Sequence, residues 1–225
     1  RIEVVEAAHP IPDSSGFNAA RRILTMVEDL SAKDLVICLL SGGGSALLSI
    51  PAEGIRLQDK QSLTAELIRS GATITEINCV RKHLSAIKGG RLAAACSPAQ
   101  ILTLAISDVP GNDISMIASG PTVPDETNRK QALNVLQQYA ITIPNNVFEC
   151  LKNPAIKTPR LDDRFFDKSE IAIIATADDA MNAAAAAALE VNIKPLVLGD
   201  QEGDARKLAQ SQAALAKAIA AGTGP

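Results

Sequence analysis

The chain has 225 residues, of which 47% are hydrophobic and 2% aromatic, and its formal net charge is −3. This length and apolar content allow a substantial core in one large domain or two small ones, and they exclude a disordered or fibrous protein. Scattered basic residues with few aromatic rings argue against nucleic acid as a partner. No run approaches the ~20 apolar residues of a membrane span, and the start shows no signal-peptide pattern.

Cysteine usage favours a cytoplasmic location. The four cysteines stand singly, without C-x-x-C pairing, at Cys38, Cys79, Cys96 and Cys150. Single cysteines inside regular elements favour reduced, buried thiols. We therefore expect a cytoplasmic protein without disulfides, and the composition leaves a homo-oligomer open.

The first segment joins a short apolar run to a proline-containing loop. Residues 2–5 are mostly β-branched and predict a strand, whereas the prolines within residues 8–16 exclude a helix there. His9 and Asp13 are candidates for function in this loop, with a structural role as the alternative. The apolar spacing that follows predicts a helix over residues 18–30.

Residues 35–48, LVICLLSGGGSALL, contain an apolar run that ends in three consecutive glycines between two serines. This pattern predicts a buried, central parallel strand, a tight loop and a helix that begins near Ser45. Glycines let a ligand's oxygens approach the backbone N–H groups, and a helix start adds a favourable dipole. We predict a phosphate or carboxylate site here, with a plain tight turn as the alternative. Its residues are Ser41, Gly42, Gly43, Gly44 and Ser45.

Named glycine motifs do not fit this loop. A P-loop needs a lysine after its last glycine, where Ala46 and Leu47 follow instead. The dinucleotide fingerprint and the hydrolase elbow both need a glycine where Leu47 stands. The anion site is therefore predicted from backbone chemistry and not from a motif.

Two helices are predicted next, over residues 59–69 and from Thr73 to about residue 85. Asp59 is expected to cap the first, and Thr73 with Glu76 has the form of a capping box for the second. Both helices carry apolar residues at helical spacing, which predicts one buried side for each.

The second of these helices also carries polar residues at helical spacing. Asn78, Lys82 and Ser85 fall roughly opposite its apolar side. Two glycines at 89–90 would let a turn bring the nearby bases together. This basic set consists of Arg81, Lys82, Lys88 and Arg91. Converging Arg and Lys side chains bind phosphates, and a solvated charged face is the alternative.

A second buried-type strand is predicted over residues 100–106, followed by Asp108 and Asp113. In open α/β sheets, ligands gather at the carboxyl ends of strands, so these acids are placed to hold Mg²⁺ or to accept a proton. Asp113 could equally be a turn residue or a helix cap. A polar loop over residues 119–125 and a helix over residues 128–139 follow.

The last third of the chain predicts a connection and then a βαβ unit. Residues 144–167 are irregular, with one helical turn near residues 147–151, and are the best candidate for a hinge. Residues 171–175, 180–189, 194–198 and 205–221 then predict strand, helix, strand and helix. We therefore expect an α/β, Rossmann-like layered fold with a mainly parallel sheet flanked by helices.

Three long motifs resemble the class II glycerate kinases. They are SGGGSALL at 41–48, EINCVRKHLSAIKGGRLA at 76–93 and SDVPGNDISMIASGPTVPD at 107–125, with HPIPD at 9–13. The resemblance implies a kinase that uses ATP and Mg²⁺ to convert D-glycerate to 2-phosphoglycerate. It also implies a Rossmann-like first domain, a smaller second domain and a cleft between them.

The resemblance implies catalytic roles for Lys82, Arg81 and Asp108, and a metal site at Asp108 and Asp113. Besides the glycine loop, the residues implied to bind nucleotide, phosphate or substrate are Asn78, Lys88, Ser119, Gly120 and Thr122. Asp108 would orient the glycerate hydroxyl or bind the metal, and the sequence leaves both roles open.

Two other functions remain in competition. Some relatives have been labelled hydroxypyruvate reductases, although no strand here is followed by a complete dinucleotide fingerprint. The second alternative is a non-catalytic anion-binding domain. Family members have a lysine-containing segment before the position that corresponds to Arg1 and glycine-rich motifs after the position that corresponds to Pro225, and residues 1–225 contain neither. We expect residues 1–225 to be the first domain of a longer protein, incomplete at its start. Such a fragment should fold yet be inactive alone, since catalysis needs a closed cleft.

Overall fold

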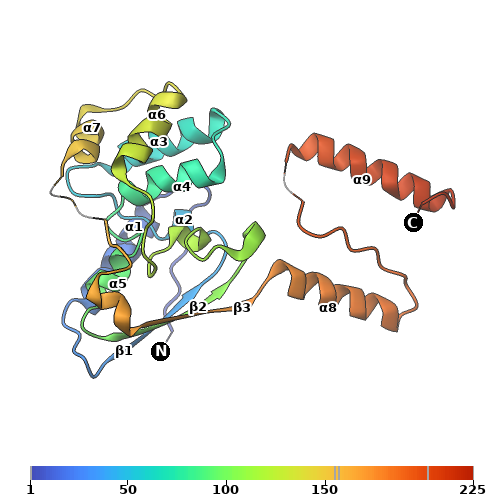
Figure 1. Ribbon diagram of the computed structural model, residues 1–225, viewed down its shortest axis with the longest axis horizontal. Coiled ribbons are helices and arrows are strands. Elements are labelled where there is room, and N and C mark those ends of the chain that lie inside the picture. The colour runs from blue at the N-terminus through green and yellow to red at the C-terminus, as the bar shows by residue number, and fades with distance from the viewer. Residues whose placement is uncertain (1, 155, 157, 202, 225) are drawn as a thin grey trace. The chain divides into compact units, whose positions relative to one another are not determined.

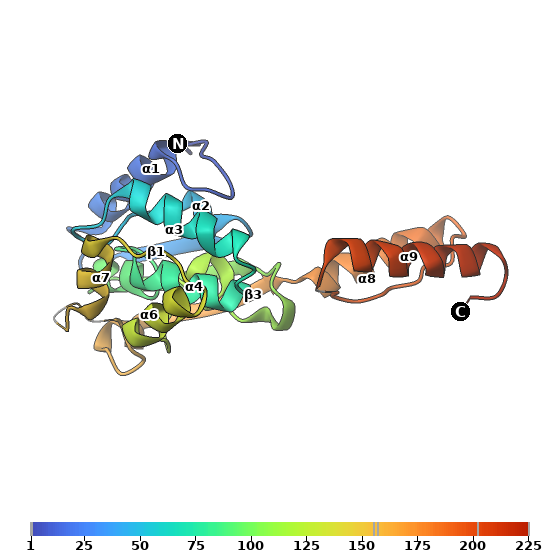
Figure 2. The same cartoon turned by 90° about the horizontal axis from the view of Figure 1, so that it is seen from above.

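The computed structural model describes residues 2–154, 156, 158–201 and 203–224 (Figures 1 and 2). The chain divides into two compact units, Arg1–Thr176 and Ala177–Pro225. The first unit contains the sheet and every residue predicted to form the site. No helix among the described residues has the length and apolar character needed to cross a membrane.

The sheet of the first unit is parallel and ordered β1-β2-β3, with β1 at Leu35–Leu40, β2 at Gln100–Ile106 and β3 at Ser169–Ala175. Leu35 pairs with Gln100, and Ile101 pairs with Ser169. The helices of this unit are α1 (Ser14–Val27), α2 (Gly44–Leu47), α3 (Leu57–Arg69), α4 (Ile74–His83), α5 (Arg91–Cys96), α6 (Arg129–Gln138) and α7 (Asn145–Lys152). The predicted α/β class with a parallel sheet flanked by helices is confirmed.

Strand β1 differs from its prediction as a buried, central strand. Among the described strands it pairs only with β2, so β2 is the central one. Its residues alternate between exposed and partly buried, and Leu35, Ile37 and Leu39 are exposed. A continuous apolar run does not say how many faces of a strand are covered, because that depends on which elements pack on it.

The chain before α1 forms no strand, contrary to the prediction for residues 2–5. Ile2 and Val4 are largely exposed, and an ion pair of 2.6 Å joins Glu3 to Arg22 of α1. Helix α1 begins earlier than predicted because the Asp13 carboxylate accepts a hydrogen bond of 2.9 Å from the Gly16 N–H. Asp13 therefore has a structural role as an N-cap.

The apolar core of the first unit consists of two clusters. Helices α3, α4, α6 and α7 lie together (Figures 1 and 2) and bury residues such as Leu63, Leu67 and Leu136. The second cluster joins α1 and α5 to the sheet through residues such as Leu92 and Ile101. Full burial of a Leu or Ile contributes about 1.5–3 kcal/mol, so these clusters supply most of the stabilisation. All four cysteines are free; Cys79, Cys96 and Cys150 are buried as predicted, whereas Cys38 is only partly buried.

The capping residues of α3 and α4 lie where they were predicted, but α3 begins earlier than predicted. Helix α3 begins at Leu57, so Asp59 lies inside its first turn, where its carboxylate bonds the N–H of Arg56 at 3.2 Å. The capping box of Thr73 and Glu76 at α4 is confirmed. Its Glu76 carboxylate also accepts a hydrogen bond of 2.8 Å from the Tyr139 hydroxyl, which ties α4 to the end of α6.

We expect Thr73→Ala to lower the free energy of unfolding by about 1 kcal/mol, because the Glu76 N–H loses its capping oxygen. Thr75→Ala is the matched control, since Thr75 is exposed in the same first turn and alanine favours a helix. Urea denaturation of both variants measures the difference. Equal midpoints would show that the capping box contributes nothing.

The second unit contains α8 (Ala177–Glu190) and α9 (Ala205–Ala220). Both helices were predicted, but the strand predicted for residues 194–198 is wrong. Residues 196–198 are exposed, and no described strand pairs with them. An apolar run becomes a strand only where a neighbouring strand supplies hydrogen-bond partners.

Candidate functional site

The glycine loop follows the carboxyl end of β1. Gly43, with φ of +80°, forms the N-cap of α2, a single turn that begins at Gly44 and not at Ser45. The helix dipole of so short an element adds little. Across the described part of the chain, the amides of Gly42, Gly43 and Gly44 have no hydrogen-bond partner. The loop therefore offers free backbone donors.

Each glycine of the loop is approached closely by another segment. A Cβ atom on Gly42 would collide with the Asp108 carboxylate, and one on Gly44 would lie 2.7 Å from the Cβ of Ala118. The imidazole of His9 lies beside Gly43. The carboxyl ends of β1 and β2 thus bring the glycine loop and Asp108 together, as expected for a parallel sheet.

A turn of unusual backbone conformation packs against the glycine loop. Ala118 and Ser119 have φ of 52° and 61°, and Gly120 follows at 56°. Left-handed backbone at non-glycine residues is costly and clusters at functional sites. The turn is buried, and the hydroxyl of Ser119 lies 2.5 Å from that of Ser45 and donates to the Asn78 side-chain oxygen at 3.0 Å.

Asp125 is the centre of a buried polar network at the C-terminal end of α4. Its Oδ1 accepts hydrogen bonds from the N–H and hydroxyl of Thr127 at 3.0 and 2.7 Å. The Lys82 ammonium lies 3.4 Å from the same oxygen, and both side chains are almost completely buried. Lys82 is therefore not on a solvated face, and its catalytic role remains a prediction beside this structural one.

His83 belongs to the same network. Its Nε2 lies 3.0 Å from the Thr127 hydroxyl and its Nδ1 3.4 Å from that of Thr158. Burial lowers the pKa of His83 to about 4, although the Asp125 carboxylate acts in the opposite direction. The imidazole is therefore neutral near pH 7 and acts as a hydrogen-bonding bridge.

The other basic residues of the predicted set, Arg91, Lys88 and Arg81, differ in their burial and hydrogen bonds. The Arg91 guanidinium donates to the carbonyls of Lys82 and Lys88 at 3.1 and 2.9 Å, so it holds the backbone. Lys88 is completely buried and its ammonium donates to the Ala118 carbonyl at 3.2 Å, which connects it to the turn under the glycine loop. Arg81 is partly exposed.

Asp113 and Thr122 make local hydrogen bonds. Asp113 is exposed, and its carboxylate accepts a hydrogen bond of 2.8 Å from the Ser115 N–H. Thr122 is buried and accepts from the Thr103 hydroxyl at 2.9 Å. Within the described ranges no three His, Cys, Asp or Glu side chains gather as metal ligands. A metal held by Asp108 and Asp113 remains a prediction.

Lys60 is one of the buried polar residues that sequence reasoning missed. Lys60 of α3 is only 2% exposed, and its ammonium has no hydrogen-bond partner among the described residues. Burial, with the charges of Arg81 and Arg91, lowers its pKa to about 7. A lysine at a helical position gives no local signal of burial, so only the packing of α3 reveals it.

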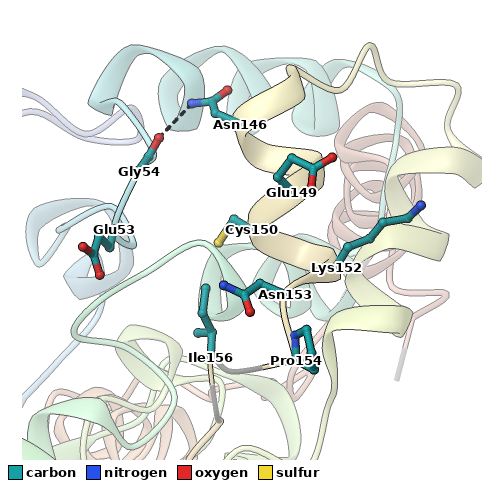
Figure 3. A pocket seen from close by; sticks show the side chains of 9 residues that line it. All are labelled: Glu53, Gly54, Asn146, Glu149, Cys150, Lys152, Asn153, Pro154 and Ile156. Atoms are coloured by element: carbon teal, nitrogen blue, oxygen red, sulfur yellow. Dashed lines mark hydrogen bonds between the residues drawn. The ribbon is translucent and has the colours of Figure 1, made fainter.

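Two surface hollows differ in character. One of about 420 Å³ is lined by Gly42 and Gly44 together with apolar residues of α1 and β1. A larger one, of about 640 Å³, runs along α7 beside Glu53 and Gly54 (Figure 3). The Asn146 side chain bonds the Gly54 carbonyl at its edge, at 3.1 Å. None of the predicted site residues lines this larger hollow.

The fold is an α/β domain in which a glycine-rich loop meets an acidic side chain at the carboxyl edge of a parallel sheet, and this edge is the candidate ligand site. The chain belongs to the family described as "Domain of unknown function (DUF4147)", whose model matches residues 1–152. The resemblance to glycerate kinases noted from the sequence is confirmed by relatives and a solved structure that carry that name.

Three comparisons illustrate the relationship. A "Putative hydroxypyruvate reductase" of Agrobacterium vitis is 46% identical over 217 residues, which is 96% of this chain and 49% of the relative. A "D-glycerate 2-kinase" of Thermotoga maritima is 47% identical over 146 residues, which is 65% of this chain and 35% of that protein. The crystal structure of a glycerate kinase from Thermotoga maritima matches with a TM-score of 0.78 and 37% identity, over 95% of this chain and 50% of that one. This chain spans about half the length of the Agrobacterium vitis relative and of the Thermotoga maritima structure.

Proposed function

We propose that the protein carrying this chain phosphorylates D-glycerate to 2-phosphoglycerate with ATP and Mg²⁺. The observation that supports this most directly is the meeting of the glycine loop with Asp108, where a Cβ on Gly42 would collide with the carboxylate. Relatives named glycerate kinase support the same reaction. Phosphoryl transfer depends mainly on positioning and on neutralising charge, and this site offers both kinds of group.

The unpartnered amides of Gly42, Gly43 and Gly44 would bind oxygens of a phosphate or carboxylate. Asp108 is exposed at the rim of the loop, so its carboxylate can reach a bound substrate. There it would hold the glycerate hydroxyl in line or help to bind the metal. Ser45 and Ser119 would keep the loop in place through their hydroxyl contact.

The residues present fit a nucleotide with its magnesium ion. The free amides suit phosphate oxygens, and Mg²⁺ commonly uses one or two carboxylates together with substrate phosphates. Asp108 would be such a ligand, with Asp113 as the second. Bound Mg²⁺ would neutralise phosphate charge during transfer. The pair of Lys82 and Asp125 would act indirectly, by holding α4 against the segment that follows the turn.

A reductase acting on hydroxypyruvate is the second candidate, favoured by the name of the Agrobacterium vitis relative. Against it, the glycine loop lacks the dinucleotide fingerprint, because Leu47 occupies a position that needs glycine. We also propose that residues 1–225 form the Rossmann-like first domain of the longer enzyme, and that this domain alone is inactive.

The test is one assay with separate arms. Purified full-length protein is incubated with D-glycerate, ATP and Mg²⁺, and the phosphoglycerate isomer is identified by NMR. A parallel arm contains hydroxypyruvate and a reduced nicotinamide cofactor, and a third repeats the kinase assay on residues 1–225. We expect 2-phosphoglycerate from the first arm alone. Oxidation of the nicotinamide without glycerate phosphorylation would reject the kinase in favour of the reductase.

A further inference from the structure

The segment before α1 brings a histidine to the glycine loop. The neighbour of Gly43 is the imidazole of His9, whereas Asp108 approaches Gly42. A Cβ atom placed on Gly43 would lie 3.6 Å from Cδ2 and 3.9 Å from Nε2 of His9, so the ring turns the edge that carries Nε2 toward the loop. The reaction as proposed above gives His9 no role.

The Asp13 carboxylate closes this segment into a loop. It accepts hydrogen bonds from the N–H of Ala8 at 3.1 Å and from the N–H of Gly16, in the first turn of α1, at 2.9 Å. The residue directly before His9 is therefore tied to the start of α1. Of the two candidates that the sequence offers in this loop, Asp13 fixes the backbone and His9 is left to interact with other groups.

Two further contacts attach the same segment to neighbouring helices. The Gln61 side chain of α3 donates a hydrogen bond of 2.6 Å to the Pro12 carbonyl. Gly16 packs against the carbonyl of Leu47 in α2, where an added Cβ would lie only 2.7 Å away. Contacts on both sides of the loop thus hold the imidazole of His9 beside Gly43.

Both ring nitrogens of His9 are open to a ligand. Within the part of the chain that the structure describes, neither nitrogen has a hydrogen bond or an ion pair. The other histidine, His83, differs in that it is buried and both of its nitrogens have hydroxyl partners. His9 is exposed, so a bound molecule can reach it without a change in the core.

We propose that Nε2 of His9 donates a hydrogen bond to the anionic group, a phosphate or a carboxylate, that the glycine loop binds. Such a group has several oxygens, so one that accepts from the Gly43 N–H at about 2.9 Å leaves another for Nε2. This inference rests on the proposed function, because it adds a residue to the same site.

Charge gives the imidazole a second effect. The Asp108 carboxylate beside Gly42 repels an anion that binds to the loop. A protonated imidazole beside Gly43 offsets part of this repulsion, and its hydrogen bond to an anion is stronger than one between neutral groups. His9 would therefore let an anion and the Asp108 carboxylate occupy the same edge of the sheet.

The test compares ligand binding by the purified full-length protein and three variants. His9→Leu removes both ring nitrogens, and His9→Gln keeps a neutral N–H donor. Ser14→Ala changes an exposed side chain at the start of α1 and is the matched control. D-Glycerate and ATP with Mg²⁺ are titrated calorimetrically in separate arms, so that the arm that responds identifies the group on the loop as a carboxylate or a phosphate.

We expect His9→Leu to bind at least one of the two ligands about tenfold more weakly, because a hydrogen bond to a charged group is lost. His9→Gln should recover part of this affinity, and Ser14→Ala should bind like the unmodified protein. In the kinase assay, His9→Leu should raise the KM of the affected ligand more than it lowers kcat, since the interaction is already present in the bound substrate. Unfolding temperatures should agree among all forms, because His9 and Ser14 are exposed.

Three results would overturn the inference. Equal affinity of His9→Leu and the unmodified protein for both ligands would show that His9 does not bind the anion. An equal loss in His9→Leu and His9→Gln would reduce the imidazole to a packing group, and an equal loss in Ser14→Ala would assign the effect to the loop as a whole.

Failure of the proposed function gives a different pattern. The unmodified protein would then bind a ligand without forming 2-phosphoglycerate, and the comparison of the variants by calorimetry would still decide the role of His9. Turnover with unchanged affinity and KM in His9→Leu would reject His9 and leave the kinase. Absence of binding of either ligand by the unmodified protein would reject both.

Discussion

Replacing Asp125 with alanine is expected to lower the free energy of unfolding by about 3–5 kcal/mol, because removal of one partner leaves a buried charge uncompensated. The Lys82 side chain is 5% exposed and the Asp125 side chain 0%, so water cannot substitute for the lost carboxylate. The N–H and hydroxyl of Thr127 also lose their acceptor. Urea denaturation of the variant and the unmodified protein measures the change.

Two comparisons separate this effect from the loss of a charge in general. Glu126→Ala removes an exposed carboxylate next in the chain, and its effect should stay within about 0.5 kcal/mol. Adding Lys82→Met to Asp125→Ala should recover part of the loss, because the orphaned ammonium is then removed. Strictly additive effects of the two changes would show that the pair is not coupled.

The same network changes what is expected of Lys82. The catalytic role that the family resemblance implies for Lys82 predicts that Lys82→Ala affects turnover more than folding. The structure pairs its ammonium with a buried carboxylate, so we expect this change to reduce stability as well. A loss of activity in Lys82→Ala is therefore informative only beside its unfolding curve.

Much of the first unit could be predicted because its signals are local. An apolar run followed by glycines predicts β1 and its loop, and the spacing of Thr73 and Glu76 predicts the start of α4. The meeting of the glycine loop with Asp108 also follows from sequence, because parallel strands end at the same edge of a sheet. These features follow from residues that are neighbours in the sequence and from the rule that parallel strands end at the same edge of a sheet.

The remaining features depend on contacts between distant segments. Helix α4 is covered on more than one side, so Asn78 and Lys82 are buried although their spacing predicts a polar face. Lys60 is a buried lysine without a hydrogen-bond partner among the described residues only because of the packing of α3. The run at residues 194–198 has the composition of a strand, but no described strand lies beside it. Composition and hydrophobic periodicity do not show which distant segments of the chain will pack together.

Replacing Gly42 with alanine is expected to lower kcat about 100-fold, because displacement of a catalytic group by ~1 Å has effects of that size. The new Cβ would occupy space now held by the Asp108 carboxylate, which must then move. Asp108 is exposed, so it can rotate away at little cost in folding. The unfolding midpoint should therefore change little while turnover of D-glycerate, measured on the full-length protein, falls.

The double variant shows whether this effect acts through Asp108. In an Asp108→Ala background the carboxylate is absent and the added Cβ meets no such group, so Gly42→Ala should then lower the residual kcat by less than about threefold. A full 100-fold loss in that background would place the effect in the loop amides themselves, as direct binders of phosphate. If Gly42→Ala leaves kcat unchanged in the unmodified background, Asp108 does not need its present position, and its proposed role in the reaction is wrong.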